Sequence, residues 1–341
     1  MVVVMSPDAP QDAIDVVVRS VEAAGGAAFV SRGIHRTIIG LVGDVSQFET
    51  LNLQALPGVS DVVRISTPYK LVSRDHHPQR STILVGGVPI GPATFTLIAG
   101  PCAVESFEQT LAAAEMARRA GAALLRGGAF KPRTSPYAFQ GLGEEGLRIL
   151  AAVRAATGLP VVTEVVDAHD VDLVAGYADM LQIGTRNMQN FALLQAVGAV
   201  AKPVMIKRGL QATIEEWLMA AEYVAQRGNL DIVLCERGIR TFEPATRNTL
   251  DISAVPVVHA LSHLPVVVDP SHAGGRRDLV VPLARAAIAI GADAVMVDIH
   301  PEPEAARCDG AQALAEPDLF DLGEAVRALA PLSGRRIAAA T

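Results

Sequence analysis

Short apolar segments alternate with helical stretches along most of this chain. The apolar cores are residues 95–99, 123–125, 161–163, 180–183, 204–206, 232–234, 266–268 and 294–297. The stretches between them, such as 108–120, 144–156, 214–226 and 279–290, have the periodicity of amphipathic helices. Eight such βα units in roughly 240 residues predict a closed (β/α)₈ TIM barrel. An open doubly wound sheet, the alternative, more often has five or six strands.

Residues 1–68 precede this alternation and have a different pattern. Strands are expected at 2–5, 27–31, 37–42 and 59–65, with residues 32–36 separating the middle two, and helices at 11–24 and 45–54. The order β-α-β-β-α-β is typical of a small α+β ferredoxin-like domain. Such domains often sense ligands, although the fold alone does not define a function.

Residues 69–80 are polar and are predicted to be a linker, with His76 and His77 in a solvated loop. The catalytic domain then spans residues 81–341. It begins with strands at 82–85 and 88–90 that Gly86 and Gly87 join into a β-hairpin. In a closed barrel, this hairpin is expected to plug the bottom.

Charge and cysteine content exclude several classes of partner. The formal net charge is −7, which disfavours general binding to nucleic acid or to an anionic membrane surface. No apolar stretch is long enough to span a membrane, and the apolar start is too short for a signal peptide. Three cysteines give no disulfide framework and indicate a reducing, cytoplasmic setting.

Cations follow several of the predicted strands. Because the carboxyl ends of parallel strands meet at one rim of a barrel, these side chains are expected to converge there. In an acidic protein, converging Arg and Lys side chains imply a bound polyanion. The cations expected to hold one phosphate and one carboxylate are Arg126, Lys131, Arg186, Lys207 and Arg237. Arg133 and Thr134 lie on the same loop as Lys131 and could bind a second phosphate further out.

A second group of chemically active side chains follows strands one, seven and eight. It consists of Cys102, His272, Asp298 and Asp309. Each alone is more often an inert buried or loop residue, but strands one and eight are neighbours in a closed barrel. A thiolate, an imidazole and two carboxylates suit a divalent transition metal with an open coordination position. Cys308 could compete as a ligand, and Cys235 is expected to pack in the core.

The motifs at these strand ends resemble those of type I 3-deoxy-D-arabino-heptulosonate 7-phosphate (DAHP) synthases of the β subgroup. The resemblance covers residues 82 to about 312 and extends by pattern alone to the regulatory ferredoxin-like domain of some members. It rests on IAGPCAVES (98–106), LLRGGAFKPRTSPYAFQG (124–141), VVTEVVD (161–167), QIGTRNMQN (182–190), IKRG (206–209), CERGIRTFE (235–243), VDPSHAGG (268–275) and DIHPEPEAARCDG (298–310).

The resemblance implies a reaction and a set of residue roles. Phosphoenolpyruvate and D-erythrose 4-phosphate would condense with water to DAHP and phosphate, the first step of the shikimate pathway. Phosphoenolpyruvate would be held by Arg126, Lys131, Arg186, Lys207 and Arg237, and the aldose phosphate by Arg133 and Thr134. Cys102, His272, Asp298 and Asp309 would hold the metal, which we expect to be Mn²⁺, with Fe²⁺, Co²⁺ or Zn²⁺ as alternatives.

One position departs from the family pattern. The family usually has Glu at position 298, and the Asp298 side chain is shorter by one C–C bond, ~1.5 Å. The 3-deoxy-octulosonate 8-phosphate synthases, which use arabinose 5-phosphate, are the most similar alternative. They typically carry Asn between the Lys and Arg of the KPRT motif, so Pro132 favours erythrose 4-phosphate.

The implied mechanism joins C3 of phosphoenolpyruvate to the aldehyde carbon, after which water adds at C2 and phosphate leaves. Glu164 and Lys131 are the candidates for positioning and deprotonating that water. We expect surrounding cations to lower the pKa of Lys131 into a working acid–base range. A Schiff-base aldolase that uses Lys131 or Lys207 as nucleophile is the second mechanism considered.

A binding role is considered for residues 1–68. The resemblance implies that they bind tyrosine or phenylalanine between two subunits and close over the barrel mouth, in a homodimer or homotetramer. The alternative is a domain that only aids assembly.

Overall fold

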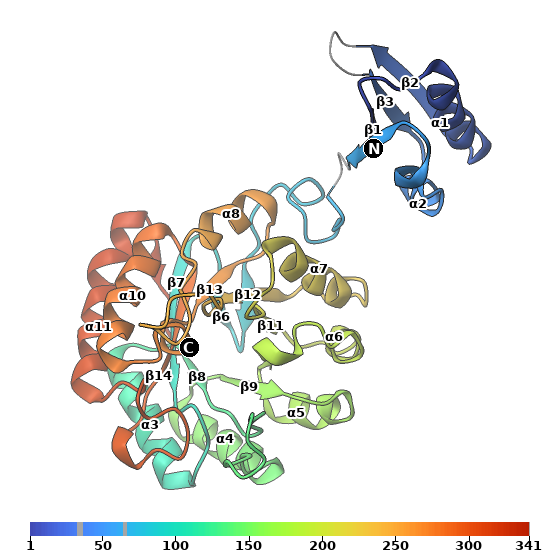
Figure 1. Cartoon of the computed structure of the whole chain (residues 1–341). Helices are drawn as coiled ribbons and strands as arrows, with labels where there is room; N and C mark the ends of the chain where they lie inside the picture. Colours follow the sequence, from blue (N-terminus) through green and yellow to red (C-terminus); the bar gives the residue numbers. More distant parts are fainter. Residues whose placement is uncertain (33–36, 64–66, 341) are drawn as a thin grey trace. The chain divides into compact units, whose positions relative to one another are not determined.

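The computed structural model describes residues 1–32, 37–63 and 67–340. The chain forms two compact units, Met1–Pro68 and Tyr69–Thr341 (Figure 1). No helix in the described parts of the chain combines the length and the apolar character needed to cross a bilayer.

The first unit has the predicted order of elements. These are β1 (Val2–Met5), α1 (Gln11–Ala23), β2 (Ala27–Arg32), β3 (Thr37–Val42), α2 (Val45–Thr50), the 3₁₀ turn η1 (Leu53–Ala55) and β4 (Val59–Val63). Its strands pair antiparallel in the order β2-β3-β1-β4. The helix expected at 45–54 stops early because Asn52 adopts a left-handed conformation with φ 44°. The separator 33–36 and the end of the strand expected at 59–65 lie outside the described residues.

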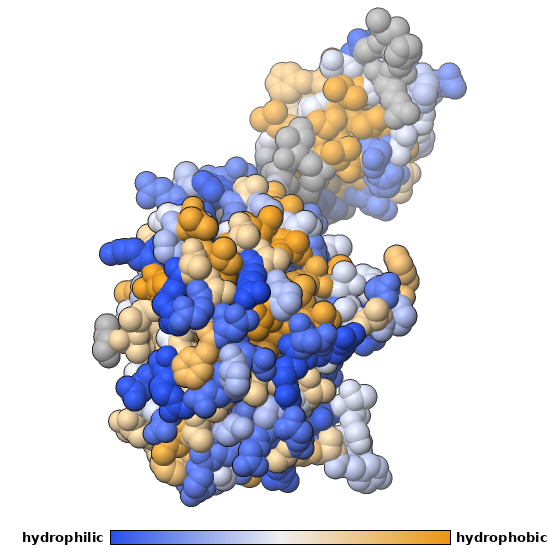
Figure 2. Space-filling view, turned by 90° about the vertical axis from the view of Figure 1, so that its left-hand side faces the viewer, coloured by the Kyte–Doolittle hydropathy of each residue, from blue (hydrophilic) through white to orange (hydrophobic). Residues whose placement is uncertain are grey.

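The two faces of this small sheet differ in burial. The inward face packs against α1 and α2, with Val3, Ile39 and Phe48 in its core. Because side chains alternate along a strand, the other face carries Phe29 and Val42, which are 64% and 61% exposed. Figure 2 shows apolar side chains on the surface of this unit. An apolar sheet face of this kind marks a contact or ligand surface.

The second unit is the predicted eight-stranded parallel barrel. Its strands pair in chain order, and β14 pairs with β7 from Ala294↔Thr96 to Asp298↔Gly100, which closes the ring. A short strand, β15 (Arg336–Ile337), adds to the start of β7. The barrel strands are β7 (Thr94–Gly100), β8 (Leu124–Arg126), β9 (Val161–Val165), β10 (Met180–Ile183), β11 (Val204–Lys207), β12 (Ile232–Glu236), β13 (Val266–Val268) and β14 (Ala294–Asp298).

Helices surround the barrel strands (Figure 1). Local signals set their ends. The Ser106 side chain caps the helix that begins at Phe107, and Thr213 and Glu216 form a reciprocal capping box at the start of the helix that begins at Ile214. The helices are α3 (Phe107–Ala120), α4 (Glu144–Thr157), α5 (Val171–Tyr177), α6 (Phe191–Gly198), α7 (Ile214–Ala225), α8 (Ala254–Leu261), α9 (Pro270–Gly274), α10 (Arg277–Ile290) and α11 (Glu316–Leu329). Short 3₁₀ turns include η2 (Ala168–Asp170), η3 (Thr185–Asn187) and η4 (Pro303–Ala305).

The hairpin β5 (Ile83–Val85) and β6 (Val88–Ile90) plugs the amino-terminal end of the barrel, as predicted. Its inward side chains pack in one cluster with strand residues that face the barrel interior, among them Ile98, Met180 and Met205. Cys235 packs in the same cluster, as expected. Since this end is filled with apolar side chains, ligands can approach the barrel only from the opposite rim.

The start of the segment 69–80, predicted to be a linker, packs on the barrel. Tyr69 and Val72 are buried, and the backbone N–H groups of Leu71 and Val72 donate to the Glu222 carboxylate at 3.0 and 3.1 Å. The polar composition of the segment gave no sign that Tyr69 and Val72 would be buried, or that the Glu222 carboxylate on α7 would accept hydrogen bonds from its backbone. His76 and His77 are exposed, as predicted.

Candidate active site

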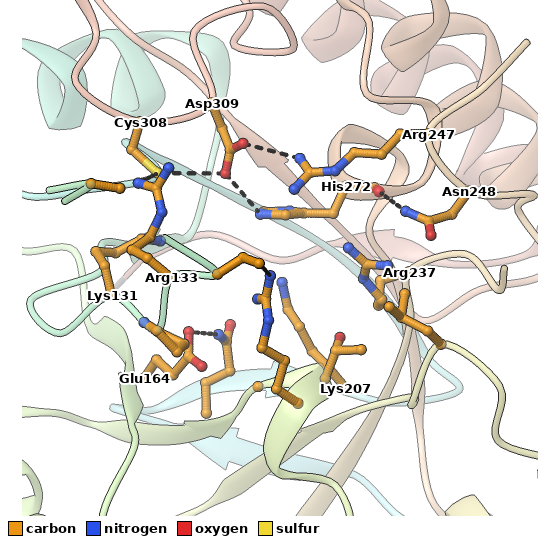
Figure 3. A pocket seen from close by; sticks show the side chains of 18 of the residues that line it. Lys131, Arg133, Glu164, Lys207, Arg237, Arg247, Asn248, His272, Cys308 and Asp309 are labelled. Atoms are coloured by element: carbon orange, nitrogen blue, oxygen red, sulfur yellow. Dashed lines mark hydrogen bonds and ion pairs between the residues drawn. The ribbon is translucent and has the colours of Figure 1, made fainter. Parts of the chain in front are cut away.

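The carboxyl ends of the barrel strands surround a cavity of about 370 Å³ (Figure 3). It opens at the rim opposite the hairpin plug. Every cation predicted at a strand end or on the following loop lines it. The ionisable or polar lining residues include Arg126, Lys131, Arg133, Thr134, Glu164, Gln182, Arg186, Lys207, Arg237, Arg240, Arg247, Asn248, His272, Cys308 and Asp309.

The structure brings four of the five predicted phosphoenolpyruvate cations to the floor of this cavity. Arg126 and Lys207 are the last residues of β8 and β11, and all of Arg126, Lys131, Lys207 and Arg237 are buried. The fifth, Arg186, is exposed on the rim, where its Nη2 lies 3.4 Å from Thr134 Oγ1. Arg186 therefore lies closer to the outer, aldose-phosphate part of the predicted site.

The buried cations are not fully neutralised. Lys207 is paired with Asp269 at 2.6 Å and Arg126 with Asp298 at 2.8 Å. Arg237 has no carboxylate partner within the described residues, and burial lowers its pKa. The Nε atom of Arg126 is also buried without a hydrogen-bond partner among those residues. A buried guanidinium with unsatisfied donors is expected to take an anionic ligand.

The prediction of a lowered pKa for Lys131 is wrong. Burial lowers it, but the nearby Cys102, Cys308 and Glu164 side chains outweigh burial and the Arg126 charge, so the pKa is raised. Its Nζ donates to the Cys102 carbonyl at 2.9 Å and lies 3.2 Å from Cys102 Sγ. Proximity to cations in the sequence did not reveal these acceptors, which meet the lysine only in the folded barrel.

Glu164 lies near the end of β9, on the same wall as Lys131 (Figure 3). Its carboxylate is buried and accepts a hydrogen bond from Gln182 Nε2 at 3.4 Å. Gly184 provides the space for it, because a Cβ atom at that position would lie only 1.9 Å from Glu164 Oε1. The two candidates for handling the attacking water are thus brought to one wall of the cavity.

The predicted metal ligands converge at the other side of the cavity, where His272 and Asp309 line it and Cys102 and Asp298 are buried next to them. Cys102 Sγ lies 3.2 Å from Asp309 Oδ2, and His272 Nε2 lies 3.6 Å from Asp298 Oδ2 and 3.9 Å from Asp309 Oδ2. Two overlapping triads have all their donor atoms within 4.8 Å of one another: Cys102, His272 and Asp298, and Cys102, Cys308 and Asp309. One imidazole, thiols and carboxylates at these separations fit a divalent transition metal.

Asp269 orients the histidine of this group. Its Oδ1 accepts the His272 backbone N–H at 3.0 Å, and its Oδ2 lies 2.8 Å from His272 Nδ1 in an ion-pair contact. Burial alone would lower the pKa of His272, but Asp269 and Asp298 raise it. With Nδ1 directed at Asp269, Nε2 faces the cavity, as metal-binding histidines require. The sequence placed Asp269 at a strand end but did not reveal this role.

Sequence reasoning missed several cavity residues on the long loop after β12. Arg247 Nη1 lies 3.0 Å from both Asp309 Oδ1 and Gln312 Oε1, and thereby holds Asp309. Arg240 and Asn248 also line the cavity. Arg240 belongs to the CERGIRTFE motif, which could have revealed it. Arg247 and Asn248 carry no local signal because they reach the cavity through the path of the loop.

Comparisons with known proteins agree along the whole chain. The models of the DAHP synthetase I family and of the DAHP synthase ferredoxin-like domain match residues 75–330 and 1–67. Phospho-2-dehydro-3-deoxyheptonate aldolase of Thermotoga maritima is 50% identical over 337 residues, which cover 99% of this chain and 100% of the relative. A 2-dehydro-3-deoxyphosphooctonate aldolase of Magnetococcus marinus is 36% identical over 268 residues, covering 73% and 92% of the two chains.

Two solved structures extend the comparison. The crystal structure of the Thermotoga maritima DAHP synthase is similar with a TM-score of 0.92 and 50% identity, covering 98% of each chain. A truncated form of the 3-deoxy-D-arabino-heptulosonate 7-phosphate synthase from the same organism gives a TM-score of 0.74 and 51% identity. It covers 78% of this chain and 98% of the truncated one.

Proposed function

Since this chain belongs to the DAHP synthetase I family and catalyses its condensation of phosphoenolpyruvate with D-erythrose 4-phosphate and water, we propose how the rim cavity performs that reaction. The products are DAHP and phosphate, in the first step of the shikimate pathway. The observation that supports the proposal is a cavity with a floor of buried cations and, at its other side, His272 and Asp309 next to the buried donors Cys102 and Asp298. The buried cations suit an anionic enol ester, and the metal-type donors suit the polarisation of an aldehyde.

The buried cations are proposed to bind phosphoenolpyruvate. Arg126, Lys131, Lys207 and Arg237 together offer enough donors for its carboxylate and its phosphate. Arg186, Arg133 and Thr134 are proposed to bind the phosphate of erythrose 4-phosphate nearer the rim, where Arg186 lies against Thr134. Bound in this way, the enol ester would present its C3 to the aldehyde carbon of the second substrate.

The proposed metal ligands are Cys102, His272, Asp298 and Asp309. A divalent ion bound there, Mn²⁺ or alternatively Fe²⁺, Co²⁺ or Zn²⁺, supplies a Lewis acid for the aldehyde oxygen. Asp269 and Arg247 hold His272 and Asp309 in place before any ion binds. Such pre-organised ligands cost little reorganisation at the moment of reaction.

The water that adds at C2 is proposed to be handled by Glu164 and Lys131. The raised pKa keeps Lys131 cationic at neutral pH, so it holds the water or donates a proton, and Glu164 is the candidate base. Phosphate then leaves by C–O cleavage, and its negative charge is stabilised by Arg237 and the other floor cations. A cationic Lys131, and a Lys207 engaged by Asp269, disfavour the Schiff-base mechanism.

A phosphate-release assay tests the substrate assignment. Purified protein with phosphoenolpyruvate and erythrose 4-phosphate is expected to release phosphate when Mn²⁺ is present. With arabinose 5-phosphate instead, we expect kcat/KM at least about tenfold lower. Comparable or faster release with arabinose 5-phosphate would instead support an octulosonate synthase. The octulosonate relative is 36% identical to 73% of this chain, whereas the heptonate relative is 50% identical to 99% of it.

We propose that the ferredoxin-like unit binds tyrosine or phenylalanine and inhibits the enzyme. Its exposed apolar sheet face offers a surface for an aromatic effector or for a second subunit in a homodimer or homotetramer.

The unpaired state of all three cysteines supports a reducing, cytoplasmic setting.

Deleting residues 1–68 tests this regulatory proposal. The chain should be cut before Tyr69, because Leu71 and Val72 are held by Glu222. The shortened enzyme is expected to keep its turnover but to lose inhibition by either amino acid, measured by phosphate release over a range of effector concentrations. The full-length enzyme is the control. Inhibition that survives the deletion would place the effector site on the barrel.

A further inference from the structure

The carboxylate of Asp298 is already engaged on both oxygens. Oδ1 lies 2.8 Å from Arg126 Nη1, and Oδ2 accepts a hydrogen bond from Gln312 Nε2 at 2.6 Å. Both Asp298 and Gln312 are buried. Each carboxylate oxygen keeps a second lone pair, so these two contacts fix the position of Asp298 and leave it able to face an ion beside Cys102 and His272. The loop that follows β14 places one more potential donor beside Cys102, which the sequence pattern left only as a competing ligand.

Cys308 is a thiol in the right place to be that donor. Its Sγ lies 3.6 Å from Cys102 Sγ and 3.5 Å from Asp309 Oδ2. With metal–sulfur bonds of ~2.3 Å and metal–oxygen bonds of ~2.1 Å, a tetrahedral ion separates two sulfur ligands by ~3.8 Å and sulfur from oxygen by ~3.6 Å. The observed separations are close to both values. Figure 3 shows Cys308 and Asp309 on the same side of the cavity, with His272 directed towards them.

The surroundings of Cys308 also suit an anionic sulfur. Arg133 Nη1 lies 3.0 Å from its Sγ, and Lys131 Nζ lies 3.2 Å from the neighbouring Cys102 Sγ. Two positive charges can therefore offset the two thiolates. An ion bound by both sulfurs would displace their protons to solvent, because only the thiolate form is a good metal ligand.

We propose that Cys308 is a direct metal ligand beside Cys102 and Asp309, in addition to His272 and Asp298 on the other side of the ion. This inference rests on the proposed metal site and changes its composition. A site with two sulfur donors is softer than one with a single sulfur, so it should favour Zn²⁺, Fe²⁺ or Co²⁺ over Mn²⁺.

The test loads reduced, full-length protein with Co²⁺ and, separately, with Zn²⁺. Thiolate-to-cobalt absorption in the near ultraviolet and X-ray absorption at the zinc edge both report the number of sulfur ligands. We expect two sulfurs per ion in the wild type and one in Cys308→Ser, with the cobalt band falling to about half. Cys235→Ser is the matched control, since this thiol packs in the barrel interior, and Asp298→Asn should also retain two sulfurs.

The outcomes separate this inference from the proposed metal site. One sulfur per ion in the wild type, or an unchanged cobalt band in Cys308→Ser, overturns the role of Cys308 and leaves a metal site with Cys102 alone as its sulfur donor. Failure of the wild type to bind either ion overturns both. If Cys308→Ser does not fold, as judged by circular dichroism, the sulfur count of the zinc-loaded wild type decides the matter.

Discussion

Replacing His272 or Cys102 with alanine is expected to reduce kcat by about 10³-fold or more, because several kcal/mol of transition-state stabilisation by the metal would be lost. The fold should survive, since His272 lies at the cavity and alanine occupies less volume than either side chain. Turnover is measured by phosphate release with phosphoenolpyruvate, erythrose 4-phosphate and added Mn²⁺. Circular dichroism and thermal unfolding check the fold.

His76→Ala is the matched control for the histidine substitution, because His76 is exposed in the segment that packs on the barrel. It should retain full activity. Treating the wild type with EDTA should reproduce the loss seen in His272→Ala, and re-adding the ion should restore turnover only in the wild type. Undiminished activity in EDTA would refute the metal role and leave the converging donors unexplained.

Replacing Lys131 with alanine is expected to lower kcat by about 10²- to 10⁴-fold, the range for loss of a positioned acid–base or water-holding group. The physical reason is its position between Cys102 and the Glu164 side of the cavity, in which the two substrates are proposed to meet. Because its pKa is raised, the lost group is a cation at neutral pH. Steady-state kinetics separate kcat from KM.

The control is Lys70→Ala, which removes an exposed lysine and should change neither constant. A Lys131→Arg variant keeps the charge but not the compact ammonium group, so it should recover substrate binding without recovering full turnover. If Lys131→Ala raised KM and left kcat unchanged, Lys131 would be a substrate-binding cation only, and Glu164 would have to handle the water without it.

Several site features could not be predicted from the sequence because they depend on contacts between distant segments. The pKa of Lys131 was expected to fall because other cations surround it in the predicted site. It rises because the folded loop brings this lysine next to the Cys102, Cys308 and Glu164 side chains, which outweigh its burial and the charge of Arg126. Arg186 follows a strand like the other cations, but it lies on the rim beside Thr134 rather than on the floor.

The segment 69–80 illustrates the same limit for the fold. Its polar composition predicted a linker, and the structure adds that two apolar residues and one buried carboxylate on α7 attach it to the barrel. Leu71 and Glu222 are separated by 151 residues, so no local pattern relates them. The position of Cys308 beside Cys102 depends in the same way on the loop that follows β14.

The sequence by itself determined the barrel, the ferredoxin-like unit and the order of chemically active residues at the strand ends. It could do so because hydrophobic periodicity is a local property, and because a closed parallel barrel brings every strand's carboxyl end to one rim. Only the tertiary structure decided which donors meet, which cations keep a carboxylate partner and how burial shifts their pKa values. These depend on distances of a few ångströms between residues up to about 200 positions apart, and Coulomb and coordination energies change steeply over such distances.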